Sequence, residues 1–121
     1  MGIGVGILVI RNHDRLKEIQ SQHPKGVYSQ EEFLSRIHKG DVFFSTKDSD
    51  YHGYEPRVLV STEEHSQGLY RYTAKVHAQT QGGFVADFFW SGDAVFTDKD
   101  AMLAYQADLR VHYAELDREA I

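Results

Sequence analysis

The sequence predicts a single α+β domain over residues 1–121. A bent, mostly antiparallel sheet of five or six strands, or a partly open barrel, is expected to pack against a long C-terminal helix and two short N-terminal helices. Three observations predict this fold class. Runs rich in aromatic and β-branched residues alternate with polar, glycine-containing breaks between residues 41 and 96. Apolar residues recur at helical spacing after Thr97, and a helix-capping sequence begins at Ser29.

Length and composition limit the classes of protein that remain. The chain has 121 residues, no cysteine and a net charge of −5. One domain is expected, without disulfides or thiolate metal sites, and a reducing, cytoplasmic location fits the absence of cysteine. The longest apolar run, residues 5–10, is far shorter than the roughly 20 residues of a membrane span. The negative charge argues against non-specific binding of nucleic acid.

The first residues alternate glycine with apolar side chains, at Gly2, Gly4 and Gly6. They precede an apolar run instead of following a strand, so they do not form a phosphate-binding loop. We expect a strand over residues 7–10 with one glycine face. Asn12 is expected to cap a short helix that ends before Pro24.

The second helix has the clearer signal. Ser29 and Glu32 have the spacing of a capping box, in which the serine side chain accepts a hydrogen bond from the Glu32 amide. Phe33 and Ile37 then lie on one helical face, and Gly40 is expected to follow the helix end.

Two strands, over residues 41–44 and 57–61, flank the most polar loop of the chain. This loop carries Tyr51, His52, Tyr54 and Glu55, and Arg57 follows it. Loops held between strands often carry functional side chains. The loop lacks the glycine and distal glutamate of a calcium-binding loop, so no calcium site is expected.

A short part of this region resembles a known family. Gly40-Asp41-Val42-Phe43-Phe44, followed by Gly53-Tyr54-Glu55 and by Arg57 at the start of the next strand, is similar to the opening of MazF/PemK-type endoribonuclease toxins. The resemblance implies a small barrel that cleaves RNA, with Arg57 as a catalytic residue. A small nuclease or hydrolase would use His52, Arg57 and a carboxylate such as Glu55 as acid, base and charge stabiliser.

The densest apolar material lies in residues 69–96. We expect a hairpin with strands over residues 69–77 and 84–90, a loop over residues 79–83, and a short third strand after Ser91-Gly92-Asp93. In the first strand Tyr70, Tyr72, Ala74 and Val76 share one face, and Arg71, Thr73, Lys75 and His77 share the other. Asp87 is expected to pair across the hairpin with the basic face. The alternative is that this face, with neighbouring aromatic residues, binds a partner.

The pattern does not decide how residues 88–90 are buried, because Phe88, Phe89 and Trp90 are apolar on both faces. An exposed Phe89 or Trp90 would mark a partner surface. The face of Tyr70 and Tyr72 is expected to pack against the last helix.

That last helix is expected to be capped by Thr97. Its main apolar stripe consists of Met102, Tyr105, Leu109, Tyr113 and Leu116. A second strip of Leu103, Ala107, Val111 and Ala114 is expected either to lie between the sheet and the N-terminal helices or to form a homodimer contact.

No nucleophile elbow, phosphate loop, zinc spacing or cofactor fingerprint is present in the sequence, so we expect no cofactor and no metal. The expected function is that of a non-enzymatic interaction protein, such as an inhibitor, an immunity-type factor or an accessory subunit. Its partner would be a protein in preference to RNA. The RNA-cleaving barrel is one alternative, and a barrel that stacks a nucleotide or another small molecule on Tyr70, Tyr72 or Trp90 is the other. The candidate binding residues are Tyr51, His52, Tyr54, Glu55, Arg57, Arg71, Lys75 and Trp90.

Overall fold

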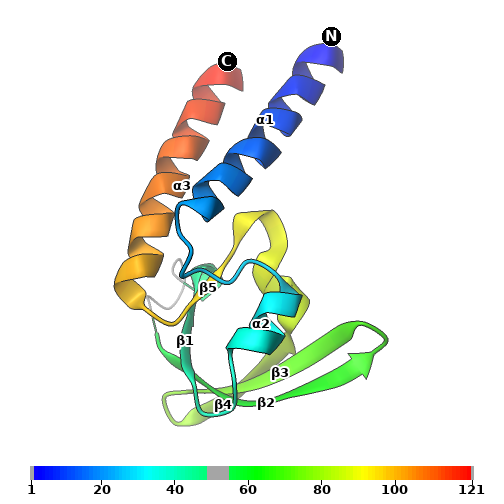
Figure 1. Ribbon diagram of the computed structural model, residues 1–121, viewed down its shortest axis with the longest axis vertical. Helices are drawn as coiled ribbons and strands as arrows, with labels where there is room; N and C mark the ends of the chain where they lie inside the picture. The colour runs from blue at the N-terminus through cyan, green and yellow to red at the C-terminus, as the bar shows by residue number, and fades with distance from the viewer. Residues whose placement is uncertain (1, 49–54, 121) are drawn as a thin grey trace.

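A computed structural model describes residues 2–48 and 55–120, with side chains over residues 12–47, 55–89 and 92–119 (Figure 1). The expected α+β class is confirmed. The described elements, in chain order, are α1 (Gly2–Ser21), α2 (Gln30–Arg36), β1 (Val42–Ser45), η1 (Thr46–Asp48), β2 (Arg57–Ser66), β3 (Leu69–Val76), β4 (Gln79–Phe84), η2 (Val85–Gly92), β5 (Val95–Phe96) and α3 (Lys99–Ala120). The helices α1 and α3 run antiparallel beside each other and extend beyond the sheet (Figure 1).

The expected strand over residues 7–10 is wrong, because α1 is one continuous helix from Gly2. Leu8 precedes Asn12, Leu16 and Ile19 at intervals of four, four and three residues, which is the spacing of one helical face. This longer period was hidden by the alternating glycines. Ile19 is buried, and the Asn12 side chain lies 2.8 Å from the His112 ring of α3. The helix is therefore held by packing against α3, in spite of the low helix propensity of glycine.

The capping prediction for α2 is confirmed. The Glu32 amide donates to the Ser29 hydroxyl at 3.2 Å, and Ser29 has the extended backbone of an N-cap. Phe33 is fully buried, and Ile37, which ends the helix, is also buried.

The sheet has five strands in the order β4-β3-β2-β1-β5, all antiparallel to their neighbours, and it does not close into a barrel. Its outermost strands are β4 and β5. The backbone of Val27 extends the β5 side by pairing with Val95, through N–H to C=O bonds of 2.8 and 3.0 Å.

The hairpin was predicted correctly in its first strand and incorrectly in its turn. The two-residue turn lies at His77 and Ala78, and residues 79–83, expected as a loop, belong to β4. The strand expected over residues 84–90 is wrong, because η2 begins at Val85. A helical turn suits this segment, since Val85 and Phe88 lie three residues apart and both are buried.

The core has two parts. The larger part joins α2, β3 and η2, where Phe88 lies 4.7 Å from Tyr72 and 5.7 Å from Phe33 between ring centroids. Phe89 is partly buried against it, and the side chain of Trp90 lies outside the described residues. The face of β3 that carries Tyr72, Ala74 and Val76 is buried as expected. Its expected partner was wrong, because it packs on Phe43 and Phe88 and not on α3.

The second part of the core lies under α3, where Met102 and Tyr105 pack with Ile19 and Phe96. Asp98 caps this helix in place of Thr97, because its carboxylate accepts from the Asp100 amide at 3.0 Å. In the second apolar strip of α3, Leu103 is half-buried, whereas Ala107, Val111 and Ala114 are exposed, Val111 to 58%. The strip is therefore not buried between the sheet and the N-terminal helices. A homodimer contact there stays a prediction.

Candidate binding surface on the sheet

The structure describes four of the eight candidate residues in full. Tyr51, His52 and Tyr54 lie outside the described residues, as does the side chain of Trp90. The remaining four, Glu55, Arg57, Arg71 and Lys75, divide among three places.

Arg57 lies inside the protein. It is 8% exposed, and its Nη1 donates to the hydroxyl of Tyr72 at 2.8 Å. A buried guanidinium needs such polar partners, because its charge loses the solvation of water. Arg57 therefore supports the inner layer of the sheet and lies on the opposite face from Arg71 and Lys75.

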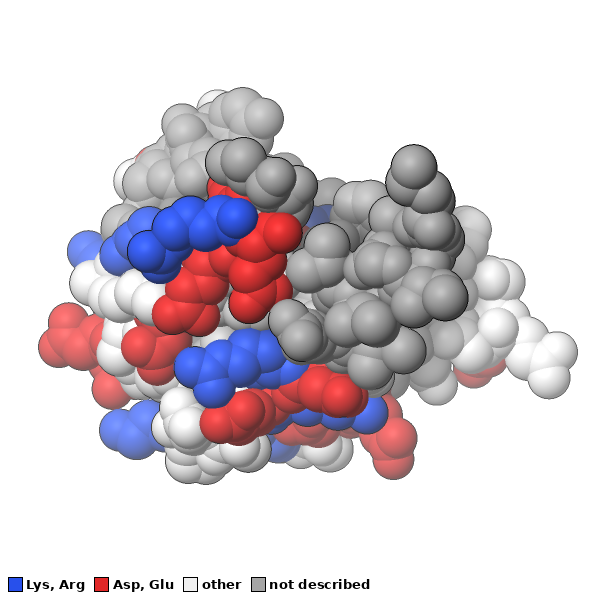
Figure 2. Space-filling model, turned by 90° about the horizontal axis from the view of Figure 1, so that it is seen from above, with Lys and Arg blue, Asp and Glu red and all other residues white. Residues whose placement is uncertain are grey.

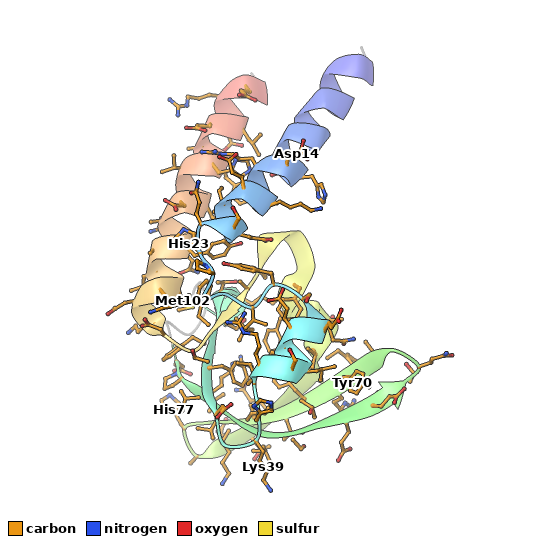
Figure 3. The ribbon with its side chains drawn as sticks, viewed as in Figure 1. Asp14, His23, Lys39, Tyr70, His77 and Met102 are labelled. Atoms are coloured by element: carbon orange, nitrogen blue, oxygen red, sulfur yellow. The ribbon has the colours of Figure 1, made fainter. Side chains whose placement is uncertain are left out.

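Glu55 belongs to the turn end of the hairpin. Its carboxylate lies 3.0 Å from Nε2 of His77, and the His77 ring is largely exposed. Figure 3 shows His77 and Tyr70 toward opposite ends of the hairpin. Neither Arg57 nor Glu55 thus joins the basic strand face that the sequence predicts.

Arg71 and Lys75 do lie together with Thr73 on the solvent side of β3, since the residues between them are buried. The strand register places further side chains on the same side. On β2, Glu63 lies opposite Arg71 and Ser61 opposite Thr73. On β4 the corresponding residues are Phe84 opposite Arg71, Gly82 opposite Thr73 and Thr80 opposite Lys75. We call these eight residues the outer sheet face.

The register also corrects the expected charge pairing. Asp87 lies in η2 and has no place in the hairpin ladder, so it is not a cross-strand partner of Arg71 or Lys75. Arg71 instead extends over the ring of Phe84, with its guanidinium carbon 5.4 Å from the ring centroid. The ring of His65 meets the same phenyl ring edge-on at 5.2 Å. Within the described residues, Arg71 and Lys75 form no ion pair with a carboxylate.

A shallow hollow lies beside this arginine. Its lining comprises Arg71, Thr73, Thr80, Gln81, Gly82, Gly83 and Phe84. The hollow exists because Gly82 carries no side chain between Thr80 and Phe84. Gly83 points the other way, since a Cβ there would lie 2.9 Å from the ring of Tyr72.

The sequence did not identify Phe84 and Gly82 as members of the outer sheet face. Their places depend on the position of the hairpin turn, and the expected turn was displaced toward Gly82 and Gly83. Once a two-residue turn at His77 is assumed, the pairing of Arg71 with Phe84 follows from the period of the strands.

A second hollow, between α1 and α3, has a different character. It is lined by Asp14, Arg15, Glu18, His112, Glu115, Leu116 and Glu119. Acidic and basic side chains are interleaved on the face seen in Figure 2. Burial lowers the pKa of His112, and the charge of Arg15 lowers it further. Among residues whose placement is described, none form a group of three that could hold a metal ion.

No described helix has the length and apolar character needed to cross a membrane. The chain matches no family model, and comparisons with curated proteins and with solved structures found no match. The outer sheet face is the best candidate site, because it combines two cations without an ion-pair partner among the described carboxylates, a half-buried aromatic ring under one of them, and a hollow.

Proposed function

We propose that the protein is a non-enzymatic interaction protein whose outer sheet face binds an acidic segment of another protein. The observation that carries the proposal is the placement of Arg71 over Phe84, at 5.4 Å, without a carboxylate partner among the described residues. A guanidinium held on an aromatic ring keeps its outward N–H donors available for a carboxylate, and the ring limits the conformations that it samples.

Lys75 adds a second positive charge on the same face. Arg71 and Lys75 lie four residues apart on the same face of β3, with Thr73 between them, so their Cα atoms are about 13 Å apart along the strand. Carboxylates at matching positions of a partner would meet both cations. The hydroxyls of Thr73 and Thr80 supply neutral hydrogen-bonding groups between them.

The number of cations on the outer sheet face favours an acidic protein segment over nucleic acid. Arg71 and Lys75 are the two cations among its eight residues. A phosphate backbone needs a broader positive surface than two cations, because its affinity comes from neutralising many phosphates.

The experiment uses a fluorescent peptide of alternating threonine and glutamate, about ten residues long, which exceeds the six residues of β4. The glutamine analogue of the peptide and an oligouridylate are the comparison probes. We expect the glutamate peptide to bind, and Arg71→Ala with Lys75→Ala to weaken binding about tenfold at low salt. Lys17→Ala with Arg110→Ala is the matched control, since it removes two exposed cations from the helices, and it should leave affinity within about twofold.

Two results would overturn the proposal. One is equal loss of affinity in the two double variants, which would mean that only net charge matters. The other is binding of the oligouridylate without binding of the glutamate peptide, which would make the surface a nucleic-acid site.

A further inference from the structure

We infer that the acidic segment binds as an added β-strand along the open edge of β4, with its carboxylates on the outer sheet face. This inference rests on the proposed function and specifies how the partner lies.

The outer edge of β4 pairs with no other strand of the described residues. The strand reads Gln-Thr-Gln-Gly-Gly-Phe, so it has no charged residue and no proline to discourage pairing, and residues 79–82 are exposed. The opposite edge of the sheet differs, because Val27 pairs with Val95 of β5. An edge of this kind is a template for strand addition by a partner.

The turn determines which backbone groups of β4 are available. Val76 and Gln79 close a two-residue turn, and the closing pair of such a hairpin exchanges both backbone hydrogen bonds. Hydrogen-bonded pairs alternate along the ladder, so Gln81 and Gly83 also bond to β3. Thr80, Gly82 and Phe84 therefore direct their N–H and C=O groups toward the open edge.

The same three residues belong to the outer sheet face. A partner residue that hydrogen-bonds to Gly82 or Phe84 must also place its side chain on that face, because paired residues of adjacent strands project to the same side. Gly82 presents no side chain to block it. Arg71 reaches over Phe84, in the direction of the edge, and so lies within range of a carboxylate on the added strand.

The positive charge of Arg71 beside this edge favours an acidic segment over a second copy of β4 as the added strand. A second copy of β4 would bring only glutamine, threonine, glycine and phenylalanine to the edge and would leave Arg71 without an anion. A segment with acidic side chains at alternate positions supplies both the backbone hydrogen bonds and the carboxylates.

The test compares two N-methylated forms of the threonine–glutamate peptide. Methyl groups on the glutamate nitrogens remove the donors that face Thr80, Gly82 and Phe84, and methyl groups on the threonine nitrogens point away from the sheet. We expect glutamate N-methylation to weaken binding at least about tenfold and threonine N-methylation to change it less than about threefold.

A variant pair tests the edge from the side of the protein. Thr80→Pro removes an N–H that faces the edge and leaves the ladder to β3 intact, whereas Thr80→Ala loses the same hydroxyl and keeps that N–H. Binding should be lost in the proline variant only, with both variants shown to be folded by circular dichroism.

The outcomes separate this inference from the proposed function. If Arg71→Ala with Lys75→Ala weakens binding but both methylated peptides bind alike, the face recognises side chains alone and strand addition is wrong. If no acidic peptide binds, both proposals fail. A dimer of the free protein that Thr80→Pro dissociates would show that the occupant is a second copy, which overturns the inference.

Discussion

The two adjacent glycines of β4 give a sharp test of the packing described above. A Cβ at Gly83 would lie 2.9 Å from Cε1 of Tyr72, whereas ordinary contacts begin at 3.4 Å, so the ring or the strand must move by about 0.5 Å. A Cβ at Gly82 would meet the carbonyl oxygen of Tyr72 at 3.3 Å, on the exposed side of an edge strand. Because neither glycine has a positive φ, steric contact is the main difference between the two substitutions.

The Tyr72 ring has little room to move. It is 6% exposed, its centroid lies 4.7 Å from that of Phe88, and its hydroxyl accepts from Arg57 at 2.8 Å. Overpacking of such a core position costs about 1–3 kcal/mol. Replacing glycine also lowers the conformational entropy of the unfolded chain, and this effect offsets about 0.4–1 kcal/mol of the overpacking cost. We therefore expect Gly83→Ala to lower the free energy of unfolding by about 1–2 kcal/mol and Gly82→Ala to leave it within about 0.5 kcal/mol.

Urea denaturation followed by circular dichroism measures both variants against the unmodified protein. In a Tyr72→Leu background the cost of Gly83→Ala should shrink, because the ring that causes the contact is gone. The packing argument would be refuted if Gly83→Ala were as stable as Gly82→Ala, or if its cost were unchanged in the Tyr72→Leu background.

Three further predictions concern polar groups of the core. Tyr72→Phe should lower the free energy of unfolding in urea by about 1.5–3 kcal/mol, because it removes the hydrogen bond to the buried guanidinium of Arg57. A decrease of less than about 0.5 kcal/mol would contradict this. Burial raises the pKa of Tyr105 from 10.0 to about 12. The contribution of its neutral phenol to the free energy of unfolding is therefore fully present below pH 10 and is lost as the pH rises through 12. Tyr105→Phe should flatten that alkaline loss in thermal denaturation, and an unchanged slope would count against it. The pKa of His112 is lowered from 6.5 by burial. The contribution of its neutral ring to the free energy of unfolding is therefore fully present above pH 6.5 and is lost as the pH falls through the folded-state pKa. Stability measured against pH in His112→Gln should lack this acid-side loss.

Local patterns predicted the elements whose own residues determine them. The capping box placed the start of α2 at Ser29, and alternation along β3 divided Tyr72 from Arg71 correctly. Both features depend on neighbours within a few residues. The helix α1 was missed because Gly2, Gly4 and Gly6 imitate a period of two, whereas the contacts that hold the helix come from α3, about a hundred residues away in the chain.

The turn was missed for a different reason. His77 has φ of 56°, in the left-handed region that favours glycine, and no glycine or asparagine marks the place. Of the two glycines that do occur in this hairpin, Gly83 makes room for the ring of Tyr72, and Gly82 lines the hollow of the outer sheet face. A glycine pair is evidence for a close approach as much as for a loop.

The displaced turn has a consequence for function. With the turn near Gly82, Asp87 would lie in the second strand and neutralise the basic face of β3. With the turn at His77, the β4 residue opposite Arg71 is Phe84, which holds the guanidinium without cancelling its charge. A paired arginine would contribute to sheet stability alone, whereas an arginine stacked on an aromatic ring beside an open edge has unused donors. The position of one two-residue turn therefore decides whether this face is a self-contained part of the sheet or a surface whose arginine forms no ion pair with a described carboxylate.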